Sequence, residues 1–474
     1  MLLSVVITCY NERNTLRTIV RRVLDAPVEG MDREIIIVDD GSTDGTSLIA
    51  DEIAAEISCV KAIHHDVNRG KGAAVRMAQK HVSGDIVVIQ DADLEYNPGN
   101  YPELLKPMLD GSADVVYGSR FAGGRARRVL FFHHHVANRI LTTLSNVTTN
   151  LNLTDMETGC KVIRGDYFRA VPLQSDGFGF EPEFTAKIAR MGLRVYEVPV
   201  DYHGRTYAAG KKINWLDGIV ALYTIFRYWL FPGLKGMPPG MQALFAMRSA
   251  TRYNRRLYER IRPFLGERVF EAGAGLGALT EYLQAQPKVL AADADPACAE
   301  WLKNAFRNSP NVETVLCDVA DAEACAKLAS QGWDTVVCVN VLEHIDDDDA
   351  ALKVFHSMLE PGGRLVLLVP CGRWLFGEMD RAFGHRRRYE RGDIASKMAA
   401  AGFAVERVFG HNRLASIPWF VNGRVFRRSS LPWMQAKICD LSVPLLRMVD
   451  PYLPLPPLSL AAVGRKAPAE NGTA

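Results

Sequence analysis

The sequence has few of the features that mark secreted, zinc-stabilised or membrane-spanning proteins. Its nine cysteines are an odd number without a Cys-x-x-Cys pair, which argues against structural zinc and indicates a reducing, cytoplasmic setting. We expect no signal peptide and no transmembrane segment, because no apolar run approaches the roughly 20 residues that a spanning helix needs. The formal net charge is only +2, which excludes strong global attraction to nucleic acid.

Length and composition favour two globular domains. The chain has 474 residues with an ordinary hydrophobic content of 48%. Gly236–Gly240 holds two glycines and two prolines, which predicts a boundary, and Ala243–Arg262 predicts a basic helix behind it. We expect a first domain over residues 1–235, a linker with its helix over 236–265, a second domain over 266–465 and a disordered tail over 466–474.

The first half contains a buried strand that runs directly into three acids. Ile86–Ile89 form a continuous apolar run, as in an inner strand of a parallel sheet, and Asp91, Asp93 and Glu95 follow. Asp91 and Asp93 are spaced to share one hard cation, Mg²⁺ or Mn²⁺, which would keep coordination positions free for substrate phosphates. A solvated acidic turn is the alternative interpretation of such spacing.

Two earlier segments repeat this pattern of strand, polar turn and helix. Leu2–Thr8 and Glu34–Val38 are apolar, and each ends in a polar turn before a helical stretch. This alternation predicts a doubly wound α/β sheet, whose ligands lie beyond the carboxyl ends of the strands. The three polar strand ends are therefore expected to face one crevice.

Four segments together resemble family 2 glycosyltransferases: Ser4–Glu12, Ile36–Gly45, Asn68–Gly72 and Asp91–Asp93. The resemblance covers roughly residues 1 to 230 and implies the A-type glycosyltransferase fold. It also implies binding of a nucleotide-sugar. The nucleoside would be held by Tyr10, Glu12 and Asp39, and the metal on the diphosphate by Asp91 and Asp93.

Later segments resemble the polyprenyl-phosphate sugar synthases within that family: Asp114–Phe121, Asp155–Lys161, Phe178–Glu183 and the basic loop His203–Lys212. The resemblance implies that Arg120 helps bind the acceptor phosphate, since guanidinium groups suit phosphate oxygens. Arg125, Arg127 and Arg128 either support it or form a solvated face. Lys161 and Glu181 are expected on the acceptor side and Arg205 near the donor diphosphate. A hydroxyl acceptor would need a general base, for which Asp155 and Glu181 are the candidates.

Two stretches of the first domain allow more than one interpretation. His133–His135 are adjacent, and neighbours on a helix point about 100° apart, so they cannot converge on one ion and are interpreted as polar or interfacial. Residues 213–234 are aromatic and flanked by Lys211, Lys212 and Lys235, but too short and charged to span a bilayer. They predict a helix that either packs on the domain or lies peripherally on the inner face of a membrane.

The second half opens with a glycine-rich turn between a strand and a helix. Gly273, Gly275 and Gly277 allow the backbone to approach a ligand closely. Asp293 follows Gly273 by twenty residues at the end of the next strand, where an acid can accept hydrogen bonds from ribose hydroxyls. Further strands are expected before Asp318, through Trp333–Ile345 and through Pro361–Pro370.

This order resembles class I S-adenosylmethionine-dependent methyltransferases over roughly residues 255–415. An NAD-dependent dehydrogenase fits poorly, because the strand end at Val341–His344 and the turn at Pro361–Gly363 are methyltransferase features. The resemblance implies that S-adenosylmethionine is bound by Glu271, Gly273, Gly275, Asp293, Asp318 and Asn340.

The methyl acceptor is expected near the ends of the later strands. Glu343 and His344 are candidates for positioning it, and a structural hydrogen bond is the alternative for His344. Gly384–Arg391 holds four arginines and indicates either an anionic acceptor or a solvated basic loop. Residues 417–457 predict an amphipathic insertion that covers the site or touches a membrane, while Ala404–Gly410 and Leu458–Val463 are expected to complete the sheet.

The two halves together suggest a bifunctional enzyme. It would transfer a sugar from a nucleotide-sugar to a polyprenyl phosphate or glycan, and would methylate a sugar or a related product. Under the rival hypothesis the acceptor is a hydroxyl and one domain is a non-catalytic binding or docking module. The sequence identifies neither the sugar nor the methylated atom.

Overall fold

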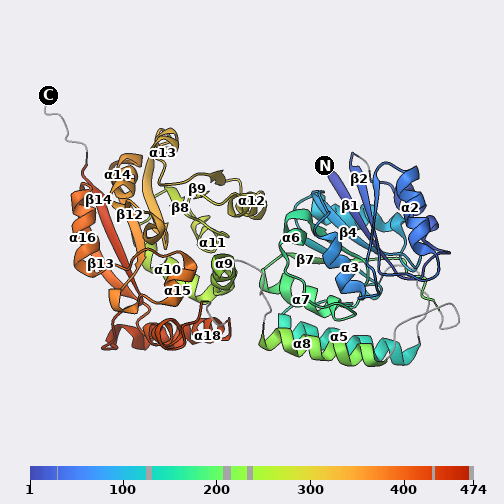
Figure 1. Cartoon of the computed structure of the whole chain (residues 1–474). Coiled ribbons are helices and arrows are strands. Elements are labelled where there is room, and N and C mark those ends of the chain that lie inside the picture. The colour runs from blue at the N-terminus through green and yellow to red at the C-terminus, as the bar shows by residue number, and fades with distance from the viewer. Residues whose placement is uncertain (29, 124–130, 206–214, 232–238, 430–432, 469–474) are drawn as a thin grey trace. The chain divides into compact units, whose positions relative to one another are not determined.

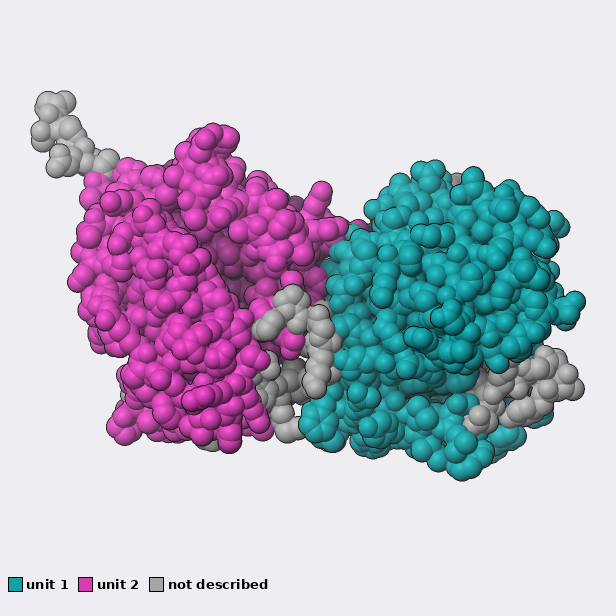
Figure 2. All heavy atoms as spheres, viewed as in Figure 1, with its two compact units in different colours: residues 1–237 teal, residues 238–474 magenta. Residues whose placement is uncertain are grey.

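A computed structural model describes the chain except residues 29, 124–130, 206–214, 232–238, 430–432 and 469–474. It consists of two compact units, Met1–Met237 and Pro238–Ala474 (Figure 2). Each unit contains a seven-stranded sheet with helices packed against it (Figure 1). The predicted fold class, two Rossmann-like α/β domains, is confirmed.

The sheet of the first unit has the strand order β3-β2-β1-β4-β6-β5-β7. Strands β1 to β4 are mutually parallel where they pair, whereas β6 runs antiparallel to both β4 and β5. The sheet is therefore mixed, which the parallel pattern of its first strands did not predict. Its strands are β1 (Leu2–Cys9), β2 (Asp32–Asp39), β3 (Val60–His64), β4 (Ile86–Asp91), β5 (Val115–Ser119), β6 (Lys161–Arg164) and β7 (Val195–Pro199).

Helices bury the apolar residues of this sheet. The main core cluster joins β1, β2 and β4 to α1, α2 and α4, and the Val and Ile side chains of the central strands are almost fully buried. Burial on both faces explains why these strands are continuously apolar. The helices are α1 (Leu16–Asp25), α2 (Thr46–Glu56), α3 (Lys71–Ala78), α4 (Tyr101–Leu109), α5 (Phe132–Thr149), α6 (Gly165–Ala170), α7 (Phe180–Arg190) and α8 (Trp215–Leu230).

Helices α5 and α8 lie side by side along one side of the first unit (Figure 1). Ala221, Thr224, Ile225 and Tyr228 of α8 are buried, so one face of this helix packs on the unit. The opposite face is apolar and open to solvent. Within the described residues, no helix is long and apolar enough to cross a membrane. Exposed apolar residues of α5, α8 and their ends, here called the α5–α8 face, are Phe131, Phe132, Val136, Ile140, Val147, Trp215, Leu216, Ile219, Val220, Tyr223, Phe226, Trp229, Leu230 and Phe231.

The sheet of the second unit has the strand order β10-β9-β8-β11-β12-β14-β13. Its first five strands are parallel, and β14 pairs antiparallel with both β12 and β13. The two late strands complete the sheet as predicted. The strands are β8 (Arg268–Ala272), β9 (Lys288–Asp293), β10 (Val312–Leu316), β11 (Trp333–Val339), β12 (Leu359–Pro370), β13 (Phe403–His411) and β14 (Ser459–Lys466).

The basic segment before the second sheet is not the single helix that we predicted. It forms two helices that break at Ala250, whose φ of −84° and ψ of 63° are not helical. The side-chain Nδ2 of Asn254 donates to the Met247 carbonyl, an acceptor in the last turn of the first helix. The helices of this unit are α9 (Pro239–Ser249), α10 (Thr251–Ile261), α11 (Thr280–Leu283), α12 (Pro296–Ala305), α13 (Ala322–Ala329), α14 (Asp348–Met358), α15 (Glu378–Phe383), α16 (Arg391–Ala400), α17 (Ser416–Phe420) and α18 (Trp433–Val449).

Candidate active sites

Acidic side chains gather at the carboxyl edge of the first sheet, where β1, β2 and β4 are neighbours. Asp91 ends β4, and Asp93 and Glu95 follow in the next turn, whose backbone is fixed by the Glu95 amide donating to Asp93 Oδ1 at 3.1 Å. Burial, together with the negative charges of Asp91 and Glu95, raises the pKa of Asp93 to about 7. A divalent cation shared by Asp91 and Asp93, the two predicted ligands, would relieve this repulsion.

Two basic side chains contact these acids from distant parts of the chain. Lys71 Nζ lies 2.8 Å from Asp91 Oδ1 and 3.0 Å from Glu181 Oε1. Arg205 Nη2 lies 3.1 Å from both Glu12 Oε1 and Asp93 Oδ2. The structure thus brings the predicted residues Glu12, Asp91, Asp93, Glu181 and Arg205 together.

Lys71 was absent from the predicted site. It belongs to the Asn68–Gly72 segment that carries the family resemblance, which was the available signal for it. Its partner Glu181, which was predicted for the acceptor side, is buried, and Glu181 Oε2 has no hydrogen-bond partner within the described residues. Burial alone would lower the pKa of Lys71. The carboxylates of Asp91 and Glu181 outweigh this effect and raise the pKa well above its usual value. Lys71 is therefore a fixed cation between these two acids.

Asp39, at the end of β2, is buried and accepts hydrogen bonds from its own turn. Ser47 Oγ donates to Asp39 Oδ2 at 2.7 Å, and the Ser42 amide donates to Asp39 Oδ1 at 3.3 Å. The neighbouring turn residue Gly41 has a φ of +69°, and a Cβ there would lie 2.5 Å from the Val67 backbone, so the turn requires glycine. Tyr10, which follows β1 at the same edge, is partly exposed.

Arg120 and Asp155 form a buried bidentate ion pair. Arg120 Nε and Nη2 lie 2.6 and 2.7 Å from the two carboxylate oxygens, and the Arg120 amide also donates to Asp155 at 3.0 Å. The guanidinium overcomes the effect of burial and keeps the pKa of Asp155 below its usual value. A carboxylate held in this way is a poor proton acceptor. Arg125, Arg127 and Arg128, predicted to support Arg120, lie outside the described residues.

Lys161 begins β6 and is completely buried near Glu157. Its Nζ donates to the Thr158 carbonyl and lies 5.1 Å from the centre of the Tyr117 ring. Burial lowers the pKa of Lys161 to about 8 and raises the pKa of Glu157 to about 8. Lys161 is therefore enclosed by protein groups.

In the second unit the glycine-rich turn lies directly beyond β8. Gly273, Gly275 and Gly277 all have positive φ, at +69°, +56° and +76°. The Gly275 amide donates to Asp293 Oδ2 at 2.7 Å, so the turn is bound to the end of β9. Thr280 Oγ1 donates to Glu271 at 2.6 Å, and burial raises the pKa of Glu271 to about 8. Four of the predicted cofactor residues thus lie together.

A Cβ on two of these glycines would meet neighbouring side chains. At Gly273 it would lie 2.2 Å from Val341 Cγ2, and at Gly275 it would lie 2.9 Å from Leu244 Cδ2. Leu244 belongs to α9, whose Arg248 also donates to the Leu276 carbonyl. Helix α9 therefore packs on the glycine turn, a contact that sequence analysis missed.

The other two predicted cofactor residues follow β10 and β11. Asp318 is exposed, and its Oδ1 accepts from the Ala320 amide at 2.9 Å. Asn340 has a φ of +53°, and its backbone N–H donates to the Leu368 carbonyl at 2.8 Å. Both lie beyond the carboxyl ends of parallel strands, at the edge that carries the glycine turn.

Glu343 and His344 form a short turn after β11, next to His385. Glu343 is completely buried, and burial raises its pKa to about 7. His344 Nδ1 lies 3.2 Å from the Gly384 carbonyl oxygen. Part of the His344 side chain stays exposed, but the protein atoms around its ring and the neighbouring His385 lower its pKa to about 4. His385 lies within the predicted basic loop Gly384–Arg391, and no separate role was predicted for it.

The arginines of that loop contact protein acceptors. Arg388 Nε donates to Asp380 Oδ1 at 2.8 Å, and Arg387 Nη1 lies 2.9 Å from Asp348 Oδ1. Arg386 Nε donates to the His344 carbonyl at 2.8 Å. These contacts hold the loop that carries His385, and the choice between an anionic acceptor and a solvated loop stays a prediction.

Comparison with known proteins identifies both units. Residues 4–171 match the family model for glycosyl transferase family 2, and residues 247–408 match a methyltransferase domain model. An undecaprenyl-phosphate mannosyltransferase from Micrococcus luteus is 31% identical over 251 residues, 49% of this chain and 96% of that protein. A dolichol-phosphate mannosyltransferase from Pyrococcus furiosus is 31% identical over 219 residues, 45% of this chain and 61% of that protein.

Among solved structures, a glucosyl-3-phosphoglycerate synthase from Mycobacterium tuberculosis, crystallised with Mn²⁺ and UDP-glucose, is 20% identical. It covers 48% of this chain and 78% of its own, with a TM-score of 0.39. Assignment to a family comes from the sequence matches. The chain belongs to glycosyltransferase family 2 through its first unit and carries a methyltransferase domain in its second.

Proposed function

We propose that the first unit transfers a sugar from a nucleotide-sugar to a polyprenyl phosphate, and that the second methylates a sugar or related product with S-adenosylmethionine. One observation carries the first half of this proposal. Glu12, Asp91 and Asp93 share a sheet edge with two cations, Lys71 and Arg205. This edge lies in the unit that aligns with 96% of a polyprenyl-phosphate mannosyltransferase.

The donor would bind across this acidic edge. Asp91 and Asp93 would hold Mg²⁺ or Mn²⁺, which when bound stabilises negative charge on the departing diphosphate. Tyr10, Glu12 and Asp39 would hold the nucleoside. Arg205 is positioned between Glu12 and Asp93, where its remaining donors can orient diphosphate oxygens.

The ion pair between Asp155 and Arg120 favours a phosphate acceptor over a hydroxyl, because it makes Asp155 a weak base. A phosphate is already ionised at neutral pH and needs no strong base, whereas a hydroxyl does. Asp155 is bound by Arg120 and is a poor base, which leaves Glu181 as the base candidate if the acceptor is a hydroxyl. Arg120 would supply positive charge on the side where the acceptor phosphate enters, with Lys161 buried behind it.

The α5–α8 face supports the lipid acceptor. A polyprenyl phosphate keeps its tail in the bilayer, so the enzyme must reach the membrane surface. Trp215, Tyr223, Phe226 and Trp229 expose between 45% and 75% of their surface on this face, and aromatic side chains of this kind suit the membrane interface. We propose that this face rests on the inner surface of the membrane.

Vesicle binding tests the membrane contact. We expect the chain to sediment with anionic vesicles, and we expect the triple change Trp215→Ser, Phe226→Ser and Trp229→Ser to reduce both sedimentation and transfer to a lipid phosphate. Leu48→Ser is the matched control, because Leu48 is 69% exposed on α2 and lies outside this face. Equal sedimentation of the triple variant and the control would contradict the assignment.

The second unit would be the methyltransferase domain, over residues 266–465, with 236–265 connecting it to the sugar transferase at 1–235. S-adenosylmethionine would lie on the turn of Gly273 and Gly275, between Glu271 and Asp293. Asp318 and Asn340 would complete the cofactor site. Glu343 and His344 adjoin this edge and would face the methyl acceptor.

Product analysis tests the whole proposal. The chain would be incubated with nucleotide-sugars, polyprenyl phosphates and S-adenosylmethionine, and product masses would report each transfer. We expect Asp93→Asn to abolish sugar transfer and to leave S-adenosylmethionine binding unchanged. Asp85→Asn, at the amino end of the same strand, is the control, since its remaining oxygen can still accept from the Leu2 amide. Transfer to a soluble hydroxyl acceptor, without vesicle binding, would favour the alternative acceptor and the Glu181 base.

A further inference from the structure

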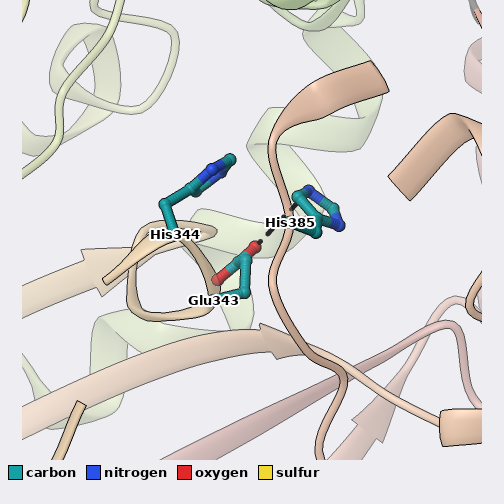
Figure 3. A group of neighbouring side chains, drawn as sticks. All are labelled: Glu343, His344 and His385. Carbon is teal, nitrogen blue, oxygen red and sulfur yellow. Dashed lines mark ion pairs between the residues drawn. The ribbon is translucent and has the colours of Figure 1, made fainter. Parts of the chain in front are cut away.

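Three potential metal ligands converge beyond the end of β11 in the second unit. Glu343 and His344 come from the turn after this strand, and His385 comes from the loop after α15 (Figure 3). One ligand atom from each residue lies within 4.8 Å of the others, and His385 Nε2 is 3.9 Å from Glu343 Oε1. In Figure 3 one carboxylate oxygen of Glu343 faces His385, to which the dashed line joins it.

Glu343 is an unusual group to bury without a hydrogen-bond partner for its carboxylate. Its side chain is inaccessible to solvent, and neither carboxylate oxygen accepts a hydrogen bond from any described residue. A buried carboxylate normally accepts hydrogen bonds or pairs with a cation, since its desolvation is costly. The side chain therefore has the capacity to bind a ligand that the protein itself does not supply.

The two histidines are oriented as metal ligands are. His385 Nδ1 is 3.0 Å from Asp380 Oδ1, and His344 Nδ1 is 3.2 Å from the Gly384 carbonyl oxygen. Both oxygens accept, so Nδ1 of each ring donates, and in the neutral imidazole Nε2 then carries the lone pair. Histidines that bind metals in proteins typically donate their other N–H to a carboxylate or a backbone carbonyl in this way.

We propose that Glu343, His344 and His385 bind a divalent first-row transition metal ion of the Zn²⁺ class. Two imidazole nitrogens and one carboxylate are the ligand set of open catalytic zinc sites, and nitrogen ligands disfavour Mg²⁺ and Ca²⁺. With ligand distances of about 2.1 Å, tetrahedral ligand atoms lie about 3.4 Å apart. The observed 3.9 Å between His385 and Glu343, within a cluster whose ligand atoms lie up to 4.8 Å apart, requires these side chains to close by about 0.5 to 1.4 Å on metal binding.

The site adjoins the cofactor turn. The His344 amide donates to the Val341 carbonyl, and Val341 Cγ2 is the atom that a Cβ on Gly273 would meet at 2.2 Å. The open coordination positions suit an oxygen of the methyl acceptor, whose hydroxyl would be made more acidic by the ion. This role rests on the proposed methyltransferase function, whereas metal binding does not.

Metal titration of the full chain tests the site. The starting protein would carry Asp93→Asn and alanine at His133, His134 and His135, so that the predicted ion site of the first unit and the run of three histidines do not contribute. Zn²⁺ would be titrated in competition with a chromophoric chelator, and Co²⁺ would report its ligands through visible absorption. We expect uptake of one ion. We expect Glu343→Gln, His344→Ala and His385→Ala each to weaken binding by about a hundredfold or more.

His356→Ala is the matched control, because His356 lies in the same unit outside the cluster, on α14. It should bind Zn²⁺ as the starting protein does. His344 is exposed, so its alanine variant should fold even if the buried Glu343 variant does not, and thermal melting without metal checks this. Absence of uptake by the starting protein, or unchanged affinity in His344→Ala, would overturn the proposal. Titration with S-adenosylmethionine separately reports failure of the proposed function.

Discussion

Breaking the Arg120–Asp155 pair should destabilise the first unit strongly. The Arg120 and Asp155 side chains are 13% and 0% exposed, and the pair is bidentate. Removing one partner of a buried ion pair costs about 3 to 5 kcal/mol, because the other charge stays buried. Arg120→Met leaves Asp155 with the Arg120 amide at 3.0 Å and Asn138 Nδ2 at 3.3 Å, so about 3 kcal/mol is expected for this variant.

A double variant isolates the interaction between Arg120 and Asp155 from the other contacts of each side chain. Arg120→Met combined with Asp155→Leu replaces both charges by apolar groups, and such replacements are often close to neutral. We therefore expect the double variant to be more stable than Arg120→Met alone, with a coupling of about 2 to 3 kcal/mol. Sugar transfer should nevertheless stay low, since the cation on the acceptor side is gone.

Scanning calorimetry of the full chain measures these changes, and nucleotide added to the sample identifies the transition of the first unit. For a unit of this size, about 1 kcal/mol shifts Tm by about 2 to 4 °C, so Arg120→Met should lower it by about 6 to 12 °C. Strictly additive single and double effects, or a shift below about 2 °C for Arg120→Met, would refute the buried-pair reasoning.

Three further predictions concern other parts of the chain. His411 is buried beside Arg260 and Arg256, which with burial lower its pKa to about 3. Its stabilising contribution is complete above pH 6.5 and is lost as pH falls, so lowering the pH to 5 should cost about 2 kcal/mol. Urea unfolding should show this for wild type and much less for His411→Gln. Gly273→Val should abolish S-adenosylmethionine binding by calorimetry, whereas Gly218→Ala, where a Cβ meets nothing within 4 Å, should not. Lys71→Met leaves Asp91 and Glu181 without their shared cation, and should raise the KM for the nucleotide-sugar, whereas Lys71→Arg should retain part of the affinity.

The strands and their polar ends could be predicted from the sequence, because their signals are local. The apolar run at Ile86–Ile89 predicted a buried central strand, and the acids after it predicted the acidic edge. Strand order could not be predicted in the same way. Strand β6 contains Lys161 and Arg164 in four residues, so its composition does not show that it lies antiparallel between β4 and β5.

The pairing of the site residues depends on contacts that are distant in sequence. Glu181 reaches Asp91 through Lys71, and a segment 35 residues away supplies the partner of Arg120. No spacing rule connects such positions, so Arg120 was predicted to bind phosphate without its carboxylate partner. The break at Ala250 was missed because neither glycine nor proline marks it. By contrast, Asp380 lies only five residues before His385, and this local spacing could have indicated an oriented histidine.

During synthesis the ribosome releases β12 and β13 well before the strand that joins them. Strand β14 (Ser459–Lys466) pairs with both neighbours, and β13 has no other partner in the sheet. A nascent chain that has passed His411 but not Ser459 therefore presents two open strand edges, which are prone to pair with other chains. The first unit has all its strands once Pro199 has emerged. Chaperones and slow translation should accordingly matter most for the second unit, over residues 412–466.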